Sequence, residues 1–144
     1  MQWWIYATVT MVMFGITNFL VKLAGHYHMD SIFTSIILWL AVGVMGLMFL
    51  FYFWHQGSFQ ENLKNTPAIY LLLPIFAGVA LAIGMYSIKI ALTKGPAGPT
   101  VAISASNAFL VAVLAFFTIG EKISVGKLIG MFVIFAGIVI MTMF

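Results

Sequence analysis

Five long apolar stretches take up nearly all of the 144 residues and constrain the fold more than any other feature. The hydrocarbon core of a bilayer is about 30 Å thick, so a helix needs roughly 20 apolar residues to cross it. Only 6% of the residues are charged, which is too few to cover a soluble domain. The sequence therefore predicts an all-α polytopic membrane protein with one transmembrane domain over residues 1–144. The five expected spans are 3–24, 31–54, 68–92, 101–120 and 125–144.

The lysines favour neither orientation in the membrane. On the side of the N-terminus the connections carry three: Lys64, Lys122 and Lys127. On the opposite side lie three more: Lys22, Lys89 and Lys94. Positive charge in short loops sets the orientation of a membrane protein, and here the count is tied. Such a chain is expected to insert both ways up, which suits dual topology and an antiparallel homodimer in a cell (inner or plasma) membrane.

Polar residues inside three of the spans are predicted to line one cleft. Polar side chains at membrane depth tend to face a cavity or a neighbouring helix, and at 100° per residue they fall on three stripes. The expected substrate contacts are Asn18 and Lys22 in the first span, Tyr86 and Lys89 in the third, and Ser104 and Asn107 in the fourth. Amides and hydroxyls would orient a small metabolite, and the two ammonium groups would favour an anionic or zwitterionic one.

Simpler interpretations compete with this cleft. Lys22 and Lys89 each lie about one turn from a helix end, where a lysine reaches the headgroups by snorkelling. Asn18 and Asn107 lie deeper, where each is either an interhelical hydrogen-bond partner or a substrate contact. Ser104 is also placed to bond back to its own helix, as serines in membrane helices commonly do.

The residues that are missing narrow the function. Asp30, Glu61 and Glu121 all fall in or beside connections, so no carboxylate is placed for proton-coupled export of cations. The three histidines lack metal-ligand spacing, and no catalytic set or basic tract occurs. The sequence therefore predicts no enzyme activity, no cofactor, no metal site and no nucleic-acid partner.

Small residues indicate where helices pack closely. Helices in lipid associate through such residues, because apolar side chains gain little over lipid tails. In the fifth span Gly126 and Gly130 form a GxxxG pair, and Gly137 follows two turns later on nearly the same face. These three glycines are the predicted interface between protomers.

Short motifs in the second half of the chain follow one another in a recognisable order. Residues 91–100 read Ala-Leu-Thr-Lys-Gly-Pro-Ala-Gly-Pro-Thr, and an apolar stretch leads to Ile-Gly-Glu-Lys-Ile-Ser at 119–124. The last span then carries Gly137 within Phe-Ala-Gly-Ile-Val, and the first half adds Gly15 followed by Lys22. This order resembles an EamA domain of the drug/metabolite transporter superfamily.

The resemblance carries expectations for assembly and function. The larger family members have ten helices as two inverted repeats, so one repeat implies a half-size transporter that pairs with an inverted copy of itself. Glu121 matches the family's acidic loop position, and its expected role is structural. The implied function is secondary transport of a small metabolite by alternating access. The alternative is a non-transporting accessory subunit, or a handler of lipid-linked intermediates, that needs a different partner chain.

Overall fold

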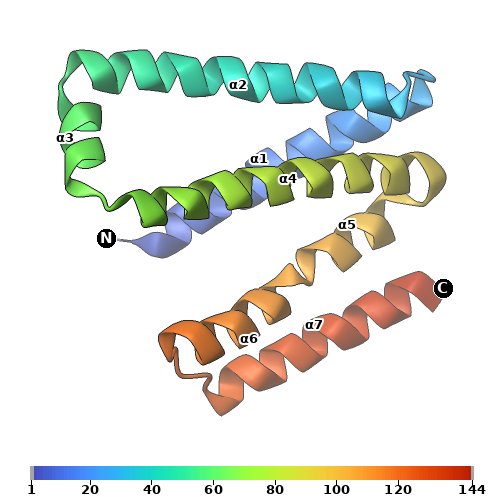
Figure 1. The fold of residues 1–144 in the computed structure, drawn as a ribbon. Helices are drawn as coiled ribbons and strands as arrows, with labels where there is room; N and C mark the ends of the chain where they lie inside the picture. Colours follow the sequence, from blue (N-terminus) through green and yellow to red (C-terminus); the bar gives the residue numbers. More distant parts are fainter. Residues whose placement is uncertain (1, 144) are drawn as a thin grey trace. The chain divides into compact units, whose positions relative to one another are not determined.

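The computed structural model describes residues 2–143, and every regular element within them is an α-helix (Figure 1). The helices, in chain order, are α1 (Trp3–His26), α2 (Ser31–His55), α3 (Ser58–Asn65), α4 (Ala68–Lys94), α5 (Ala97–Ala105), α6 (Asn107–Ile119) and α7 (Val125–Met143). By length and composition five segments can cross a membrane: α1, α2, α4, α5 with α6, and α7. The predicted all-α polytopic membrane fold is confirmed.

The fourth span differs from its prediction in two ways. It begins at Ala97 rather than at residue 101, with extended Pro96 (φ −65°, ψ 141°) as its N-cap. It is also interrupted at Ser106, where α5 ends and α6 begins. The backbone N–H of Ser106 donates to the Ile103 carbonyl oxygen at 3.2 Å, and its hydroxyl donates to the same oxygen at 2.6 Å. These contacts tighten the turn and replace the regular helical ladder.

The connection between the second and third predicted spans is partly helical. Gly57 leaves α2 with a left-handed φ of 77°, a conformation that glycine adopts without a steric cost. The short helix α3 follows at once and packs against α2. The rings of Trp54 and Phe59, whose centroids lie 5.9 Å apart, join the two helices.

The chain divides into two compact units. The first comprises residues 1–22 and 91–144, and the second comprises residues 23–90. In the first unit α5 packs against α6 and α7, and a Cβ placed on Gly98 would lie 3.4 Å from the Met141 methyl carbon. In the second unit the packing is between α2 and α3.

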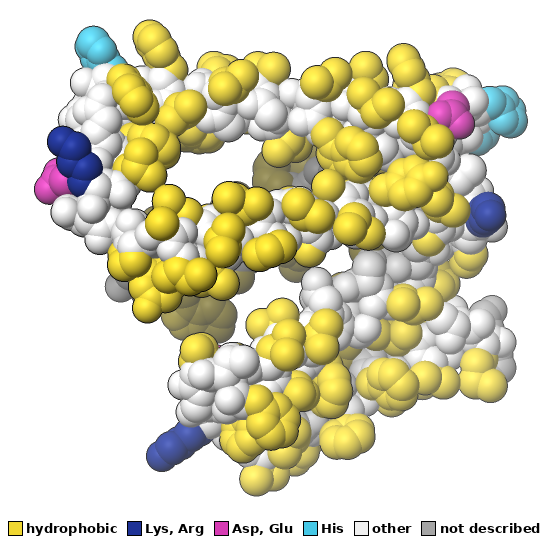
Figure 2. Space-filling model, viewed as in Figure 1, with side chains coloured by type: hydrophobic (Ala, Val, Ile, Leu, Met, Phe, Trp, Pro, Cys, Tyr) yellow, Lys and Arg dark blue, Asp and Glu magenta, His cyan; other side chains and the backbone are white. Residues whose placement is uncertain are grey.

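Very little side-chain surface is enclosed within one chain. Among the described residues the buried side chains are Val21 and Leu92 in the first unit, and Ser35 and Lys89 in the second. Hydrophobic side chains cover most of the visible face of the helices (Figure 2). In a bilayer this surface meets lipid tails or another helix, so its exposure carries no penalty of the kind it would carry in water.

Candidate functional site

The six predicted substrate contacts fall in both units. The first unit holds Asn18, Lys22, Ser104 and Asn107, and the second holds Tyr86 and Lys89. Among the four in the first unit, no hydrogen bond joins any two within the described residues. The structure therefore places each residue on its helix as predicted, while the cleft that would unite all six stays a prediction.

The Lys22 ammonium bonds to the end of α4 within the first unit. It donates to the Leu92 carbonyl oxygen at 2.6 Å and to the Gly95 carbonyl oxygen at 2.9 Å. The side chain is half-buried. A cation at a helix C-terminus is stabilised by the helix dipole and by the terminal carbonyls that lack helical partners. The sequence analysis expected Lys22 to reach either the headgroups or a substrate, and it did not predict this bond to the backbone. A substrate role for Lys22 stays a prediction.

The two asparagines keep their amides available. Asn107 is exposed at the first position of α6, directly after the break at Ser106, and Asn18 is half-buried in α1. Within the described part of the chain, neither side-chain amide forms a hydrogen bond. An amide at membrane depth costs free energy until it finds a partner. Both are therefore suited to bond a solute or another chain.

Ser104 behaves as the simpler interpretation expects. Its hydroxyl donates back to the helix, with the Thr100 carbonyl oxygen at 3.1 Å and the Val101 carbonyl oxygen at 3.0 Å. The hydroxyl oxygen can still accept a hydrogen bond, because each hydroxyl has lone pairs as well as one proton. Ser104 therefore remains a candidate acceptor beside the break.

Lys89 and Tyr86 lie on α4 in the second unit. Lys89 is only 2% exposed, whereas a snorkelling lysine keeps its ammonium in contact with water and headgroups. Tyr86, about one turn earlier on the same helix, is half-buried. The structure thus favours an enclosed Lys89 over a snorkelling one, and its contact with a solute stays a prediction.

A groove of about 340 Å³ lies beside the break, in the first unit. Its lining from the fourth span includes Ser106, Ala108 and Phe109, and α7 supplies the rest: Leu128, Met131, Phe132, Ile134 and Phe135. Ser106 is the polar residue of this lining. Sequence reasoning did not include Ser106 among the site residues and missed both the break and the groove. The available signal was the cluster of Ser104, Ser106 and Asn107, since serine and asparagine offer the backbone alternatives to the helix.

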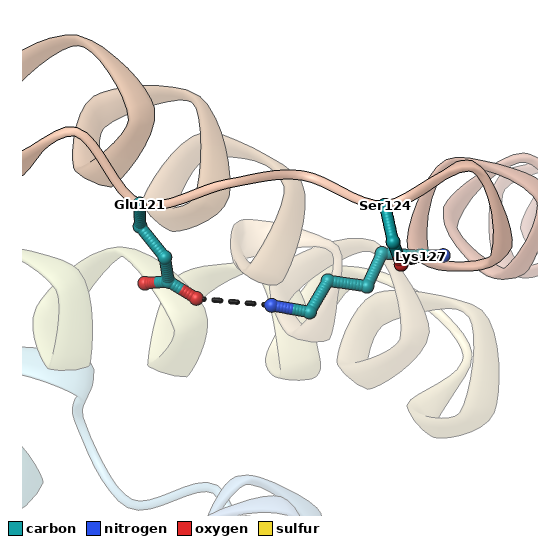
Figure 3. A network of polar contacts seen from close by, with 3 residues as sticks. All are labelled: Glu121, Ser124 and Lys127. Atoms are coloured by element: carbon teal, nitrogen blue, oxygen red, sulfur yellow. Dashed lines mark hydrogen bonds and ion pairs between the residues drawn. The ribbon is translucent and has the colours of Figure 1, made fainter.

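Glu121 joins the fourth span to the fifth through an ion pair (Figure 3). Its carboxylate lies 3.0 Å from the ammonium of Lys127, which is in the first turn of α7. Gly120, with a left-handed φ of 69°, ends α6, and its N–H donates to the Ala115 carbonyl oxygen. The Ser124 hydroxyl accepts the backbone N–H of Lys127 at 3.3 Å. The structural role expected of Glu121 stays a prediction.

The three glycines of the predicted protomer interface are open. A Cβ placed on Gly126, Gly130 or Gly137 would meet nothing within 4 Å. Packing within the first unit therefore does not require small residues at these positions. An approach by another helix would use it, and the interface stays a prediction.

The chemistry of these residues is that of binding. Amides and hydroxyls donate and accept hydrogen bonds, and an ammonium group attracts anions. Within residues 2–143, no three His, Cys, Asp or Glu side chains gather where they could hold a metal ion. The arrangement is suited to a small polar solute.

Comparison with known proteins agrees with this description. The EamA-like transporter family matches residues 1–143. No curated protein and no solved structure matches the chain. Five spans with a short Gly-Glu-basic connection before the last one are what a single EamA repeat supplies. The chain therefore belongs to the EamA-like transporter family, within the drug/metabolite transporter superfamily.

Proposed function

We propose that the chain is a secondary transporter that moves a small metabolite across a cell (inner or plasma) membrane by alternating access. It works as an antiparallel homodimer. Transporters of this kind rock one repeat against another around a site near the bilayer midplane, and the two repeats are commonly inverted copies. One EamA repeat is present in this chain, so a second, inverted copy supplies the other half.

The break in the fourth span is the observation that carries this proposal. It divides a 23-residue span into helices of 9 and 13 residues, so it lies near the middle of the bilayer. Irregular backbone at this depth is tolerated where it is buried in protein or lines a water-filled cavity. Transporters use such broken helices to bind their substrates, and the N-terminus of the second half favours a negative charge. Asn107 stands at that N-terminus.

The solute site combines these groups. Asn107 and Asn18 bond the polar part of the solute through their free amides, and Ser104 accepts a hydrogen bond. The sequence pattern adds Tyr86, with its hydroxyl, and Lys89, whose ammonium draws an anionic group such as a carboxylate. The preferred substrate class is therefore a small anionic or zwitterionic metabolite.

The antiparallel arrangement is supported by two further observations. Three lysines fall on each side of the membrane and there is no arginine, so neither orientation is favoured. The glycines of α7 leave an open, small-residue face at which another helix can approach closely. An inverted pair of identical chains also makes the two access states equivalent in energy.

The experiment is uptake into proteoliposomes from a panel of small carboxylates and amino acids. Asn107→Ala and Lys89→Met are each expected to lower uptake at least about tenfold, because each removes a hydrogen-bond or charge contact to the solute. Their matched controls are Asn65→Ala on α3 and Lys94→Met, both at exposed positions. Dimer yield is expected to be the same in all four. Unchanged uptake in both site variants refutes the site.

The orientation of the chain is tested separately. C-terminal reporters that are active on opposite sides of the membrane should both be active if the chain inserts both ways. Activity of one reporter alone excludes the inverted homodimer. Together with failure to self-associate in mild detergent, it supports the accessory-subunit alternative.

A further inference from the structure

Two backbone carbonyl oxygens at the junction of α4 and α5 each have a proline, which carries no N–H, four residues further along the chain. The Leu92 carbonyl would accept the N–H of residue 96 if α4 continued, but residue 96 is proline and has no N–H. The Gly95 carbonyl stands just before the N-cap of α5, and the residue four places on is Pro99, which also has no N–H. Both oxygens thus need a donor from elsewhere in the molecule.

A single side chain supplies that donor to both. The Lys22 ammonium lies 2.6 Å from the Leu92 oxygen and 2.9 Å from the Gly95 oxygen, at sequence separations of 70 and 73 residues. An ammonium has three N–H groups, so both carbonyls are satisfied and one donor remains. The position also suits a cation because the negative end of the α4 dipole lies there.

The connection between the two helices is tightly built around these oxygens. The Gly95 N–H donates to the Ala91 carbonyl oxygen at 2.7 Å. A Cβ on Gly95 would lie 3.2 Å from that oxygen and 3.2 Å from the Thr100 hydroxyl. The Thr100 hydroxyl in turn donates to the Pro96 carbonyl oxygen at 2.7 Å. Only small adjustments are available here without breaking a hydrogen bond.

We propose that Lys22 is a positioning residue. Its ammonium binds the Leu92 and Gly95 carbonyl oxygens and thereby fixes the point at which the fourth span starts. The role goes beyond the proposed function and takes Lys22 out of the set of solute contacts. The first span thereby sets the direction of α5, which carries Ser104 toward the break at Ser106. The same two prolines that begin the fourth span create the need for the lysine.

The test is chemical rescue of the thermal stability of the purified protein in detergent. Lys22→Ala is expected to lower the melting temperature by roughly 5–10 °C, because two charge-assisted hydrogen bonds are lost and two carbonyls are left without donors. Added n-propylammonium replaces the deleted atoms from Cγ to Nζ and should recover at least half of the loss. Tetramethylammonium at equal ionic strength should not, since it has no N–H.

The matched control is Lys94→Ala. Lys94 is exposed in the last turn of α4, so this variant removes the same charge from the same helix end without touching the two carbonyls. Its melting temperature should stay within about 2 °C of wild type and should not respond to n-propylammonium. Equal losses in Lys22→Ala and Lys94→Ala overturn the proposal, as does an equal response to both ammonium ions.

A second pair of variants decides the matter if Lys22→Ala yields no folded protein. Lys22→Arg keeps cationic N–H donors and is expected to melt well above Lys22→Met, which keeps the length and loses the donors. Equal melting temperatures for the two overturn the proposal. None of these readouts uses a transported solute, so failure here leaves the proposed transport function standing, and failure of transport leaves this role of Lys22 standing.

Discussion

Gly95→Ala offers a sharp test of how the α4–α5 connection is packed. The new methyl carbon would lie 3.2 Å from the Ala91 carbonyl oxygen and 3.2 Å from the Thr100 hydroxyl oxygen. Both oxygens are held in place, because the first accepts the Gly95 N–H at 2.7 Å and the second donates to the Pro96 carbonyl at 2.7 Å. Either the turn must open or one of these bonds must lengthen.

The magnitude follows from two opposing effects. Overpacking by one methyl group costs about 1–3 kcal/mol. Replacing glycine also restricts the unfolded chain, which returns about 0.4–1 kcal/mol. The net loss in the free energy of unfolding is therefore about 1–2 kcal/mol, or roughly 3–6 °C in melting temperature at this chain length.

The assay is thermal unfolding of the purified protein in detergent, with Gly43→Ala in α2 as the control. A Cβ on Gly43 meets nothing within 4 Å, so this variant should melt at or slightly above the wild-type temperature, since alanine suits a helix interior better than glycine. A Gly95→Ala protein that melts as high as Gly43→Ala would refute the packing argument.

Three further changes have defined outcomes. Gly120→Ala places a side chain at a left-handed φ of 69°. It should lower the free energy of unfolding by about 1–2 kcal/mol, measured by thermal unfolding in detergent. An unchanged melting temperature would contradict the role of Gly120 in ending α6. Glu121→Gln breaks an ion pair whose side chains are 54% and 53% exposed, so the free energy of unfolding should fall by less than about 1 kcal/mol and the melting temperature by no more than about 2–3 °C. Gly130→Leu fills the open glycine face of α7 and should reduce the dimer fraction in mild detergent, measured by cross-linking, without lowering the yield of monomer; an undiminished dimer fraction would place the interface elsewhere.

Hydropathy predicts the spans well because it reports burial in lipid. The structure places the ends of the first three predicted spans, such as 3–24 and 68–92, within about two residues of the helix ends. The fourth span begins at Ala97 rather than at residue 101, although Pro96 and Pro99 lie at its start. Proline is tolerated at the N-cap, where Pro96 stands, and at the third helical position, where Pro99 stands, because the first N–H groups of a helix have no partners.

Local hydrogen bonding is what hydropathy does not report. Ser104, Ser106 and Asn107 make the stretch around the break locally polar, but the span as a whole keeps a mean hydropathy of 2.0, so a window average passes over the break. The break depends on the Ser106 hydroxyl and N–H, which both donate to the Ile103 carbonyl oxygen. Such local bonds compete with the regular hydrogen bonds of the helix. The helix α3 was missed for a related reason, since its polar composition is typical of loops as well as of short exposed helices.

The sequence analysis names candidate site residues, whose contact with a solute stays a prediction, and it does not foresee the hydrogen bonds that some of them make. Asn18 and Asn107 stand out in sequence because amides are costly in a membrane. The bonds of Lys22 to Leu92 and Gly95 join residues far apart in the chain, and no periodicity within one helix can reveal them. The sequence shows Pro96 and Pro99, which have no N–H to donate, but it does not show that Lys22 donates to these two carbonyls instead.

The two-part fourth span has a mechanical consequence in a bilayer of changing thickness. A helix of 9 residues is about 14 Å long and one of 13 residues about 20 Å, so each half lies mainly in one lipid leaflet. A continuous helix answers thinning of the bilayer by tilting as a whole. A span that is interrupted at Ser106 can instead bend there. The tilt of α5 can then change with the thickness of one leaflet, and the tilt of α6 with that of the other. In an inverted pair of chains, the half that senses the outer leaflet in one copy would sense the inner leaflet in the other.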